Sequence, residues 1–453
     1  MSEQKLIENV ETIFTADAEG RELTDGYVLV DGRQISEVGT SPYEGPKPDR
    51  VIDGTDKVMI PGLINTHHHL FQTLFRNFKE VNNAKLFTWL TELYDRWAKV
   101  DRRAIHTSTV IGAVELLLSG ATTTSDHLYL FPDGKNDIFD AEVEAAQEVG
   151  IRFHPCRGSM SLSREDGGLP PREVVQTEEE IVAEYRRVID KFHDPDKFAM
   201  TKVALAPCSP FSVTDKIMKE TVEIAEEEDL YLHTHLAETE DETEFCQDEV
   251  GLRPVDYMEE LGWLTDRVWF AHVVHVNEEE IEKLAEAGVG MSHCPSSNMR
   301  LGSGIAPVVK MKDTDIKVSM AVDGSASNDT SNMIKELRQA LLLQRVKYGA
   351  DSITPREVLR FGTIEGAKAL GREDELGSIE PGKAADLVMV DLNRLEYAGG
   401  LSDPVSALLM CDTKGVDFNM VNGEVLVEDG ELCDRELLDY VDEQNEIAAR
   451  FYS

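Results

Sequence analysis

Basic residues are scarce in this chain of 453 residues, where 45 Lys and Arg stand against 86 Asp and Glu and the formal net charge is −41. Such a surface repels nucleic acid and anionic membranes, so we expect neither as a partner. Hydrophobic residues still make up 41% of the chain, which is enough for a sizeable core. The composition therefore excludes a disordered acidic polymer and predicts a folded, water-soluble protein.

Cysteine pairs and long apolar runs are also missing. The six cysteines form no CxxC pair, which argues against a disulfide framework and against a structural zinc knuckle. No stretch of about 18 uncharged apolar residues occurs, and the opening segment MSEQKLIENVETIF lacks a basic region followed by an apolar one. We therefore expect a cytoplasmic protein with reduced, mostly buried thiols.

Short apolar runs alternate with longer segments of helical period between residues 58 and 370. This pattern is typical of repeated βα units and a parallel sheet. The eight runs are 58–64, 121–126, 151–156, 202–207, 230–235, 267–272, 288–293 and 316–323. The sequence thus predicts an α/β protein built on a (β/α)8 TIM-type barrel, with the helices as an outer ring.

The two ends of the chain read differently from its middle. Residues 26–38 and 416–428 each hold two alternating runs around a dipeptide suited to a tight turn, Asp31-Gly32 in one and Asn422-Gly423 in the other. Neither hairpin can bury its own sheet, so we expect both ends to form one small discontinuous β-sandwich domain. The predicted division is 1–57 plus 372–453 for this domain, including a C-terminal helical extension, and 58–371 for the catalytic barrel.

Polar residues at the ends of the predicted strands form a candidate metal site. Barrel enzymes carry their reacting groups at these carboxyl ends. Because side chains alternate along a strand, His67 and His69 share a face, and His235 and Asp323 end two further runs. Three imidazoles and a carboxylate suit zinc or another divalent ion and leave a position for water. His233 shares the strand face of His235, so the residues alone leave the choice between these two open.

At these positions the chain resembles the amidohydrolase superfamily, in its branch of mononuclear zinc deaminases that act on purines, pterins and related heterocycles. The resemblance is carried by PGLINTHHHLFQ (61–72), HTHLAE (233–238), AHVVH (271–275), SHCPSSNMRLGSGIAP (292–307), VDGSASND (322–329) and LGSIEPGKAADLVMVD (376–391). It implies a metal held by His67, His69, His235 and Asp323. It also implies that Asp323 is catalytic together with Glu238 and His272, in the hydrolytic deamination of a small heterocycle.

The expected number of metal ions follows from a residue in which this sequence differs from many other members of the superfamily. Many of its hydrolases hold two metals bridged by a carboxylated lysine at the end of strand four, but that end reads Ala206-Pro207-Cys208-Ser209 here. Lys202 lies at the start of this run, on the wrong side of the barrel. We therefore expect one divalent ion, with zinc favoured. Cytidine-type deaminases are excluded, because Pro207-Cys208 lacks the second cysteine of their PCxxC motif.

The substrate is the least constrained part of the hypothesis. Segments 122–134, 157–171 and 206–214 look most like those of the members that convert 8-oxoguanine to uric acid. Isocytosine, pterins, guanine and hydroxylated aminotriazines remain alternatives. Candidate ring-binding residues are Gln72, Trp89, Arg157, Cys208 and His127. Trp89 fits a core position equally well, and for Arg157, Cys208 and His127 a packing, ion-pair or structural role is an equal alternative.

Two further interpretations concern partners. Relatives of this kind often form symmetric oligomers, so a homo-oligomer such as a dimer is expected beside the small-molecule substrate. A zinc-holding barrel that has lost catalysis and serves as an interaction scaffold is a distant alternative. The presence of Glu238 and His272 together with all four ligands speaks against it.

The acidic residues predict a dependence of stability on salt. They are spread along the chain, as at 178–180, 226–229 and 278–280, which is typical of solvated helix surfaces. Adaptation to a salt-rich cytoplasm is a further hypothesis, because salt screens the mutual repulsion of such charges. We expect the thermal unfolding midpoint to rise between low and molar KCl. Equal midpoints in the two conditions would contradict this hypothesis.

Overall fold

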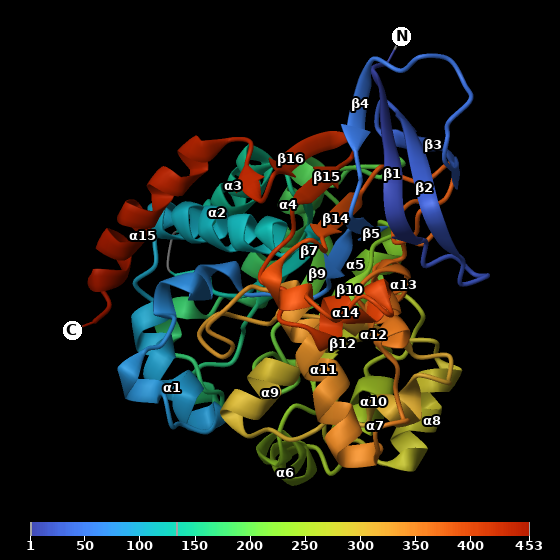
Figure 1. The fold of residues 1–453 in the computed structure, drawn as a ribbon. Helices are drawn as coiled ribbons and strands as arrows, with labels where there is room; N and C mark the ends of the chain where they lie inside the picture. Colours follow the sequence, from blue (N-terminus) through green and yellow to red (C-terminus); the bar gives the residue numbers. More distant parts are fainter. Residues whose placement is uncertain (1, 133–134, 453) are drawn as a thin grey trace.

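Eight parallel strands form the centre of the molecule in a computed structural model that describes residues 2–132 and 135–452 (Figure 1). Residues 133–134, which end the segment 122–134, lie outside the described residues. The strands are β6 (Leu63–Asn65), β7 (Ala121–Leu128), β8 (Arg152–Ser159), β9 (Ala204–Pro207), β10 (Leu232–Leu236), β11 (Val268–His272), β12 (Gly290–His293) and β13 (Lys317–Met320). They are hydrogen-bonded in sequence order. The Thr66 amide donates to the Met320 carbonyl at 3.1 Å and joins the first strand to the last.

Helices connect these strands and follow the last of them in the chain. They are α1 (Leu86–Trp97), α2 (Arg102–Leu118), α3 (Ile138–Val149), α4 (Glu178–Phe192), α5 (Asp215–Glu227), α6 (Glu240–Glu249), α7 (Pro254–Glu260), α8 (Glu278–Glu286), α9 (Pro295–Leu301), α10 (Val308–Met311), α11 (Met333–Tyr348), α12 (Pro355–Phe361), α13 (Ile364–Ala369), α14 (Pro404–Met410) and α15 (Tyr440–Ala449). Reciprocal capping boxes start α4, α8 and α12, because Thr or Asn stands three residues before Glu. The expected TIM-type barrel is confirmed.

Both chain ends meet in a second sheet of nine strands. Its strands are β1 (Gln4–Phe14), β2 (Glu22–Asp31), β3 (Gln34–Thr40), β4 (Arg50–Asp53), β5 (Lys57–Pro61), β14 (Leu387–Asp391), β15 (Phe418–Val421), β16 (Glu424–Glu428) and β17 (Glu431–Leu432). The two expected hairpins are β2–β3 and β15–β16, and Gly32, Asn422 and Gly423 take the positive φ that their turns require. Pairing of β5 with β14 joins the halves into one sheet, and residues from both ends share a hydrophobic core.

The first expected barrel run, 58–64, is divided between the two sheets. Residues up to Pro61 belong to β5 in the small sheet, and the barrel begins at Leu63. Gly62 makes this change of direction possible, because a Cβ there would lie 2.1 Å from Oγ1 of Thr122. The domain division given above stays a prediction, and the strand pairing places residues 58–61 with the chain ends.

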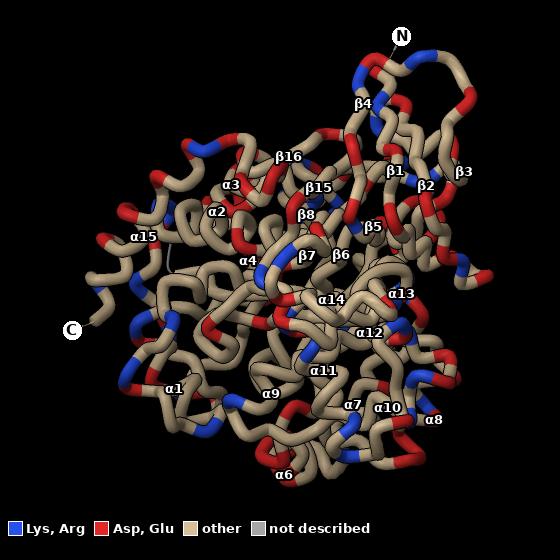
Figure 2. Tube along the Cα trace, viewed as in Figure 1, with Lys and Arg blue, Asp and Glu red and all other residues tan. Residues whose placement is uncertain are grey.

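Acidic side chains are spread over the outer helices and the small sheet rather than gathered in one tail (Figure 2). Among the described residues, no helix combines the length and the apolar character needed to cross a bilayer.

A buried ion pair fastens the small sheet to the barrel. Arg152 of β8 is fully buried, and its Nε and Nη2 lie 3.2 and 3.1 Å from the two carboxylate oxygens of Asp386, just before β14. Nη1 of Arg152 also donates to the Phe198 and Ala199 carbonyls, each at 2.8 Å. The guanidinium is thus almost fully satisfied, as a buried charge must be.

Replacing Asp386 with Ala should lower the free energy of unfolding by about 3–5 kcal/mol, because it leaves an unpaired charge in the interior. Urea unfolding in molar KCl measures the change. Glu431→Ala is the matched control, since its partner Arg435 and Glu431 itself are exposed, and we expect about 1 kcal/mol or less there. A loss in Asp386→Ala no larger than in this control would contradict the interpretation.

Candidate metal centre and active site

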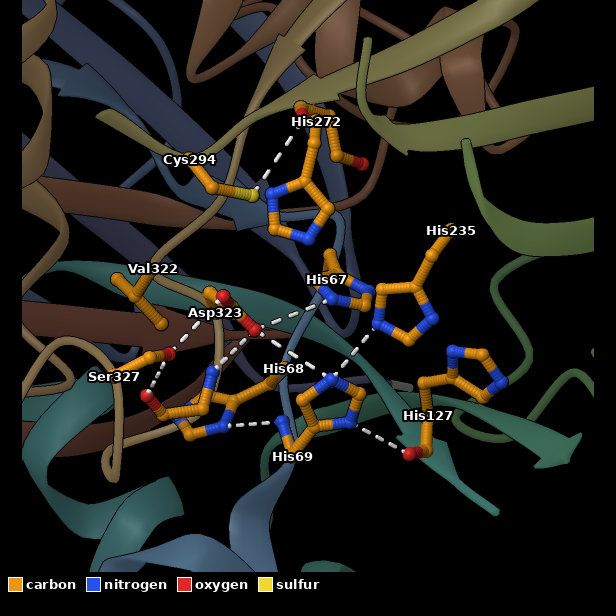
Figure 3. Close-up of polar contacts among 12 residues, drawn as sticks. His67, His68, His69, His127, His235, His272, Cys294, Val322, Asp323 and Ser327 are labelled. Atoms are coloured by element: carbon orange, nitrogen blue, oxygen red, sulfur yellow. Dashed lines mark hydrogen bonds and ion pairs between the residues drawn. The ribbon is translucent and has the colours of Figure 1, made fainter. Parts of the chain in front are cut away.

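The four expected ligands converge at the carboxyl end of the barrel (Figure 3). His67 and His69 follow β6, His235 lies in β10 and Asp323 follows β13. Oδ1 of Asp323 lies 3.3 Å from Nε2 of His67 and 3.5 Å from Nε2 of His69. Nε2 of His69 lies 3.2 Å from Nε2 of His235. Within the described chain, the ligand atoms of the three histidines all lie within 4.8 Å of one another.

Hydrogen bonds to carbonyl groups fix the tautomers of two of these imidazoles. Nδ1 of His69 donates to the His127 carbonyl at 2.8 Å, and Nδ1 of His235 donates to the Cys208 carbonyl at 2.5 Å. A carbonyl oxygen can only accept, so each Nδ1 holds the proton and each Nε2 presents a lone pair. Two lone pairs that face one another at 3.2 Å repel unless a cation lies between them. This arrangement fits a metal ion.

The third imidazole is oriented by His233. Nδ1 of His233 donates to the Trp269 carbonyl at 2.7 Å, so its Nε2 must accept the proton on Nδ1 of His67, also at 2.7 Å. Nε2 of His67 is then left buried without a hydrogen-bond partner. Both nitrogens of His233 are used in hydrogen bonds, whereas Nε2 of His235 stays available. The geometry thereby separates the two residues that the strand pattern left open.

Charges at the cluster match the requirements of a divalent ion. Burial lowers the pKa of His67 and His69 and brings that of His235 to about 3, so all three imidazoles are neutral at pH 7. Burial alone would raise the pKa of Asp323, but its close contact with His67 and the nearby His272 and His69 hold that pKa well below its ordinary value. Neutral nitrogens beside a carboxylate are a typical donor set for zinc.

Two of the site residues have unusual backbone conformations. His272 at the end of β11 and Asp323 after β13 have φ values of 73° and 61°, in the left-handed region that non-glycine residues rarely adopt. Asp323 is held there by its amide, which donates to the His67 carbonyl at 3.2 Å. Such strain concentrates at functional sites, because surrounding structure must maintain it. Here it turns both side chains from strand ends into the barrel mouth.

Glu238 and His272 form a proton-holding pair beside the cluster. Oε2 of Glu238 lies 3.6 Å from Nε2 of His272, whose Nδ1 donates to Oδ1 of Asn298 at 3.0 Å. Burial raises the pKa of Glu238 to about 7, so the carboxyl exchanges its proton near neutral pH. Burial disfavours the charged form of His272, yet the carboxylates of Glu238 and Asp323 and the bond to Asn298 raise its pKa.

A small, mostly enclosed cavity opens in front of these groups. Gln72, Trp89 and Cys208 line it, as expected for residues that contact a ligand. Burial raises the pKa of the Cys208 thiol to about 12, so this group is neutral. Oε1 of Gln72 accepts the Ala326 amide proton at 3.3 Å. A Cβ at Gly324 would lie 2.0 Å from the same oxygen, so only glycine leaves room for this amide.

Aromatic walls of the cavity were not anticipated from the sequence. Tyr94 of α1, Tyr129 after β7 and Phe211 after β9 line it together with Trp89. Tyr94 lies four residues after Leu90, which also lines the cavity, and this helical spacing on one face was a usable signal. Phe211 and Tyr129 lie in loops, whose positions no local pattern indicates. A narrow aromatic cavity suits a flat ring.

Two of the candidate ring-binding residues, Arg157 and His127, do not line this cavity, which agrees with the packing role that was the equal alternative for each. The Arg157 guanidinium stacks 3.3 Å above the ring centroid of Phe131 and donates to Oε1 of Gln176 at 2.8 Å, away from the cavity lining. The His127 ring stacks on His235 with centroids 4.9 Å apart, and its Nε2 donates to the Ala206 carbonyl at 2.7 Å. Both residues lie near the carboxyl ends of their strands, Arg157 in β8 and His127 in β7, and both side chains are fully buried in the surrounding packing.

Comparison with known proteins agrees with this architecture. The model of the amidohydrolase family matches residues 58–426. The 8-oxoguanine deaminase of Pseudomonas aeruginosa is 47% identical over 424 residues, which cover 94% of each chain. The hydroxydechloroatrazine ethylaminohydrolase of Pseudomonas sp. is 35% identical and covers 88% of this chain and 83% of its own.

A solved structure is similar over almost the whole chain. The atrazine chlorohydrolase of Arthrobacter aurescens TC1, crystallised in complex with zinc, superposes with a TM-score of 0.94 at 33% identity. The match covers 98% of this chain and 100% of the other. Zinc therefore occurs in a close structural neighbour, and the described residues offer a His and Asp cluster of the same kind.

Replacing His235 with Ala should lower the zinc content of the purified protein well below one per chain, because it removes one of the four donors. Metal analysis after dialysis against a weak chelator measures this. His106→Ala is the control, since His106 pairs with Glu148 on the surface of α2 and should keep its metal. A His235→Ala variant that retains stoichiometric zinc would shift the ligand role to His233.

Proposed function

The chain belongs to the amidohydrolase family, and we propose that it is a zinc-dependent deaminase that converts 8-oxoguanine to uric acid and ammonia. The cavity that places Glu238 and His272 beside four converging ligands carries the proposal for the reaction. The 47% identity to the Pseudomonas aeruginosa enzyme, over 94% of both chains, supports the choice of ring.

We assign one zinc ion to Nε2 of His67, His69 and His235 and to the carboxylate of Asp323. When bound, a divalent ion lowers the pKa of a coordinated water from ~16 towards ~7 and so supplies a nucleophile at neutral pH. We assign no second ion bridged by a carboxylated lysine. Lys202 precedes β9 and so lies at the opposite end of this strand from the ligands, and its Nζ lies 3.2 Å from Oε1 of Glu375.

Three side chains of the site move or hold protons in the proposed reaction. Asp323 accepts a proton from the attacking water, whose oxygen adds to the ring carbon that carries the amino group. His272 donates from Nε2 to the developing negative charge, while Asn298 holds its Nδ1. Glu238 delivers a proton to the adjacent ring nitrogen. Asp323 then passes its proton to the amino group and Glu238 takes up the proton of the new hydroxyl group. The carbon–nitrogen bond breaks, ammonia leaves and a carbonyl group remains.

The cavity supports a planar, amide-like substrate. The Gln72 amide can both donate and accept, which matches the edge of an oxidised purine. Trp89 and Tyr129 supply apolar surface for the ring faces, and the neutral Cys208 thiol is a weak donor. Hydroxylated aminotriazines are the second candidate, because a relative that is 35% identical is an aminohydrolase of such a ring.

Ammonia release from the zinc-loaded protein tests the proposal, at low and molar KCl, with 8-oxoguanine, guanine, isocytosine, isoxanthopterin, cytosine and a hydroxylated aminotriazine. We expect 8-oxoguanine to have the highest kcat/KM, because the relative that is 47% identical over 94% of both chains is an 8-oxoguanine deaminase. Preference for another ring would contradict the proposed substrate and leave the proposed deamination reaction intact. No turnover of any ring by stoichiometrically loaded protein would favour the scaffold hypothesis instead.

Glu238→Gln should lower kcat by about 10²–10⁴-fold, because an amide cannot transfer a proton. Zinc content and thermal midpoint should stay close to those of the unmodified protein. Glu240→Gln is the matched control, since Glu240 is exposed at the start of α6 and should keep full activity. Activity of Glu238→Gln within three-fold of the control would refute the assigned role.

A further inference from the structure

The C-terminal helix returns from the small sheet to the barrel and packs on the segment that carries Gln72. This segment is the 3₁₀ helix η1 (Leu70–Phe75), which directly follows the ligand His69. Helix α15 runs beside α2 and contacts both α2 and η1 (Figure 1). The Phe451 ring lies 4.9 Å from the Phe75 ring, centroid to centroid. The end of the chain thus covers the outer side of a segment whose inner side faces the cavity.

One hydroxyl group joins three elements at this contact. Oγ1 of Thr73 in η1 donates its only proton to the Ser108 carbonyl of α2 at 3.1 Å. Nε2 of Gln444 in α15 donates to Oγ1 of Thr73 at 3.0 Å. Gln444 is only 8% exposed, so this bond is shielded from water. A buried pair of this kind is costly to break, because the freed groups find no replacement partner.

Close packing holds η1 from the side of α2 as well. A Cβ at Gly112 of α2 would lie 2.5 Å from Cδ2 of Leu70 and 3.3 Å from Cγ2 of Thr73. The Leu70 amide also donates to Oδ1 of Asp126 at 2.5 Å. A 3₁₀ helix has poorer internal hydrogen bonds than an α-helix. The position of η1 therefore depends on these external contacts.

We propose that Gln444 is a positioning residue for substrate binding. Through Thr73 it holds η1 in register, so that the neighbouring Gln72 keeps its amide in the cavity. The inference rests on the proposed function, because it takes Gln72 as a contact of the ring. The metal site should be independent of Gln444, since His67 and His69 precede η1 and are oriented by His233 and the His127 carbonyl.

Steady-state kinetics of Gln444→Ala, Thr73→Val and the double variant test the inference, with the ring that the unmodified protein turns over best. We expect each single variant to raise KM about five-fold, with kcat within about two-fold and zinc content unchanged. The double variant should equal Thr73→Val alone, because Thr73→Val already removes the bond from Gln444 together with the bond to the Ser108 carbonyl. Thr73→Ser keeps the hydroxyl and should restore KM. Asn445→Ala, at an exposed position of the same helix, is the control.

Hydrogen–deuterium exchange supplies a readout that does not depend on activity. Peptides that cover residues 68–76 should exchange faster in Gln444→Ala than in Asn445→Ala. Unchanged exchange together with unchanged KM would overturn the inference, and so would a joint loss of kcat and zinc, which indicates a merely structural role. If the unmodified protein turns over none of the rings, the proposed function fails, whereas the exchange data still decide whether Gln444 holds η1.

Discussion

Three imidazole lone pairs and one carboxylate point at a common position in the barrel mouth, and the surrounding structure has to hold them there against their mutual repulsion. It does so through hydrogen bonds to the ring nitrogens that face away from this position. Nδ1 of His69 and of His235 donates to a main-chain carbonyl, and Nδ1 of His67 donates to His233, which is itself fixed by the Trp269 carbonyl. Each ring is therefore locked in rotation and tautomer by parallel strands whose order the barrel fixes. A divalent cation converts this repulsion into attraction.

The same burial acts in opposite ways on the carboxylates of the site. Asp323 lies 3.3 Å from Nε2 of His67 and stays ionised, whereas Glu238 faces His272 at 3.6 Å and burial raises its pKa to about 7. One carboxylate is therefore suited to hold a cation and the other to carry a proton. Separating the pKa values of two similar groups by their surroundings is a common way for enzymes to run acid and base chemistry at one pH.

The small sheet and the C-terminal helix contribute to the site although neither enters it. The sheet is anchored to the barrel by the buried pair of Arg152 and Asp386, and α15 then continues from the sheet to the outer side of η1. Oγ1 of Thr73 accepts a hydrogen bond from Gln444, which lies 371 residues further along the chain. The ends of the chain thus help to form the cavity wall by packing.

Local sequence patterns determined the strands, the two hairpins and the ligand positions in this protein, because periodicity, turn dipeptides and strand ends are properties of neighbouring residues. His67, His69, His235 and Asp323 became candidate ligands because they lie at or just after the ends of apolar runs, and the family resemblance implied the same set. The strand pattern left the choice between His235 and His233 open and the family resemblance favoured His235, and the hydrogen bonds that occupy both nitrogens of His233 agree with that choice. The placement of Arg157 outside the cavity lining, the aromatic walls at Tyr129 and Phe211 and the contact between Gln444 and Thr73 were decided only in three dimensions. These features depend on side-chain packing between elements distant in the chain, which no local pattern records.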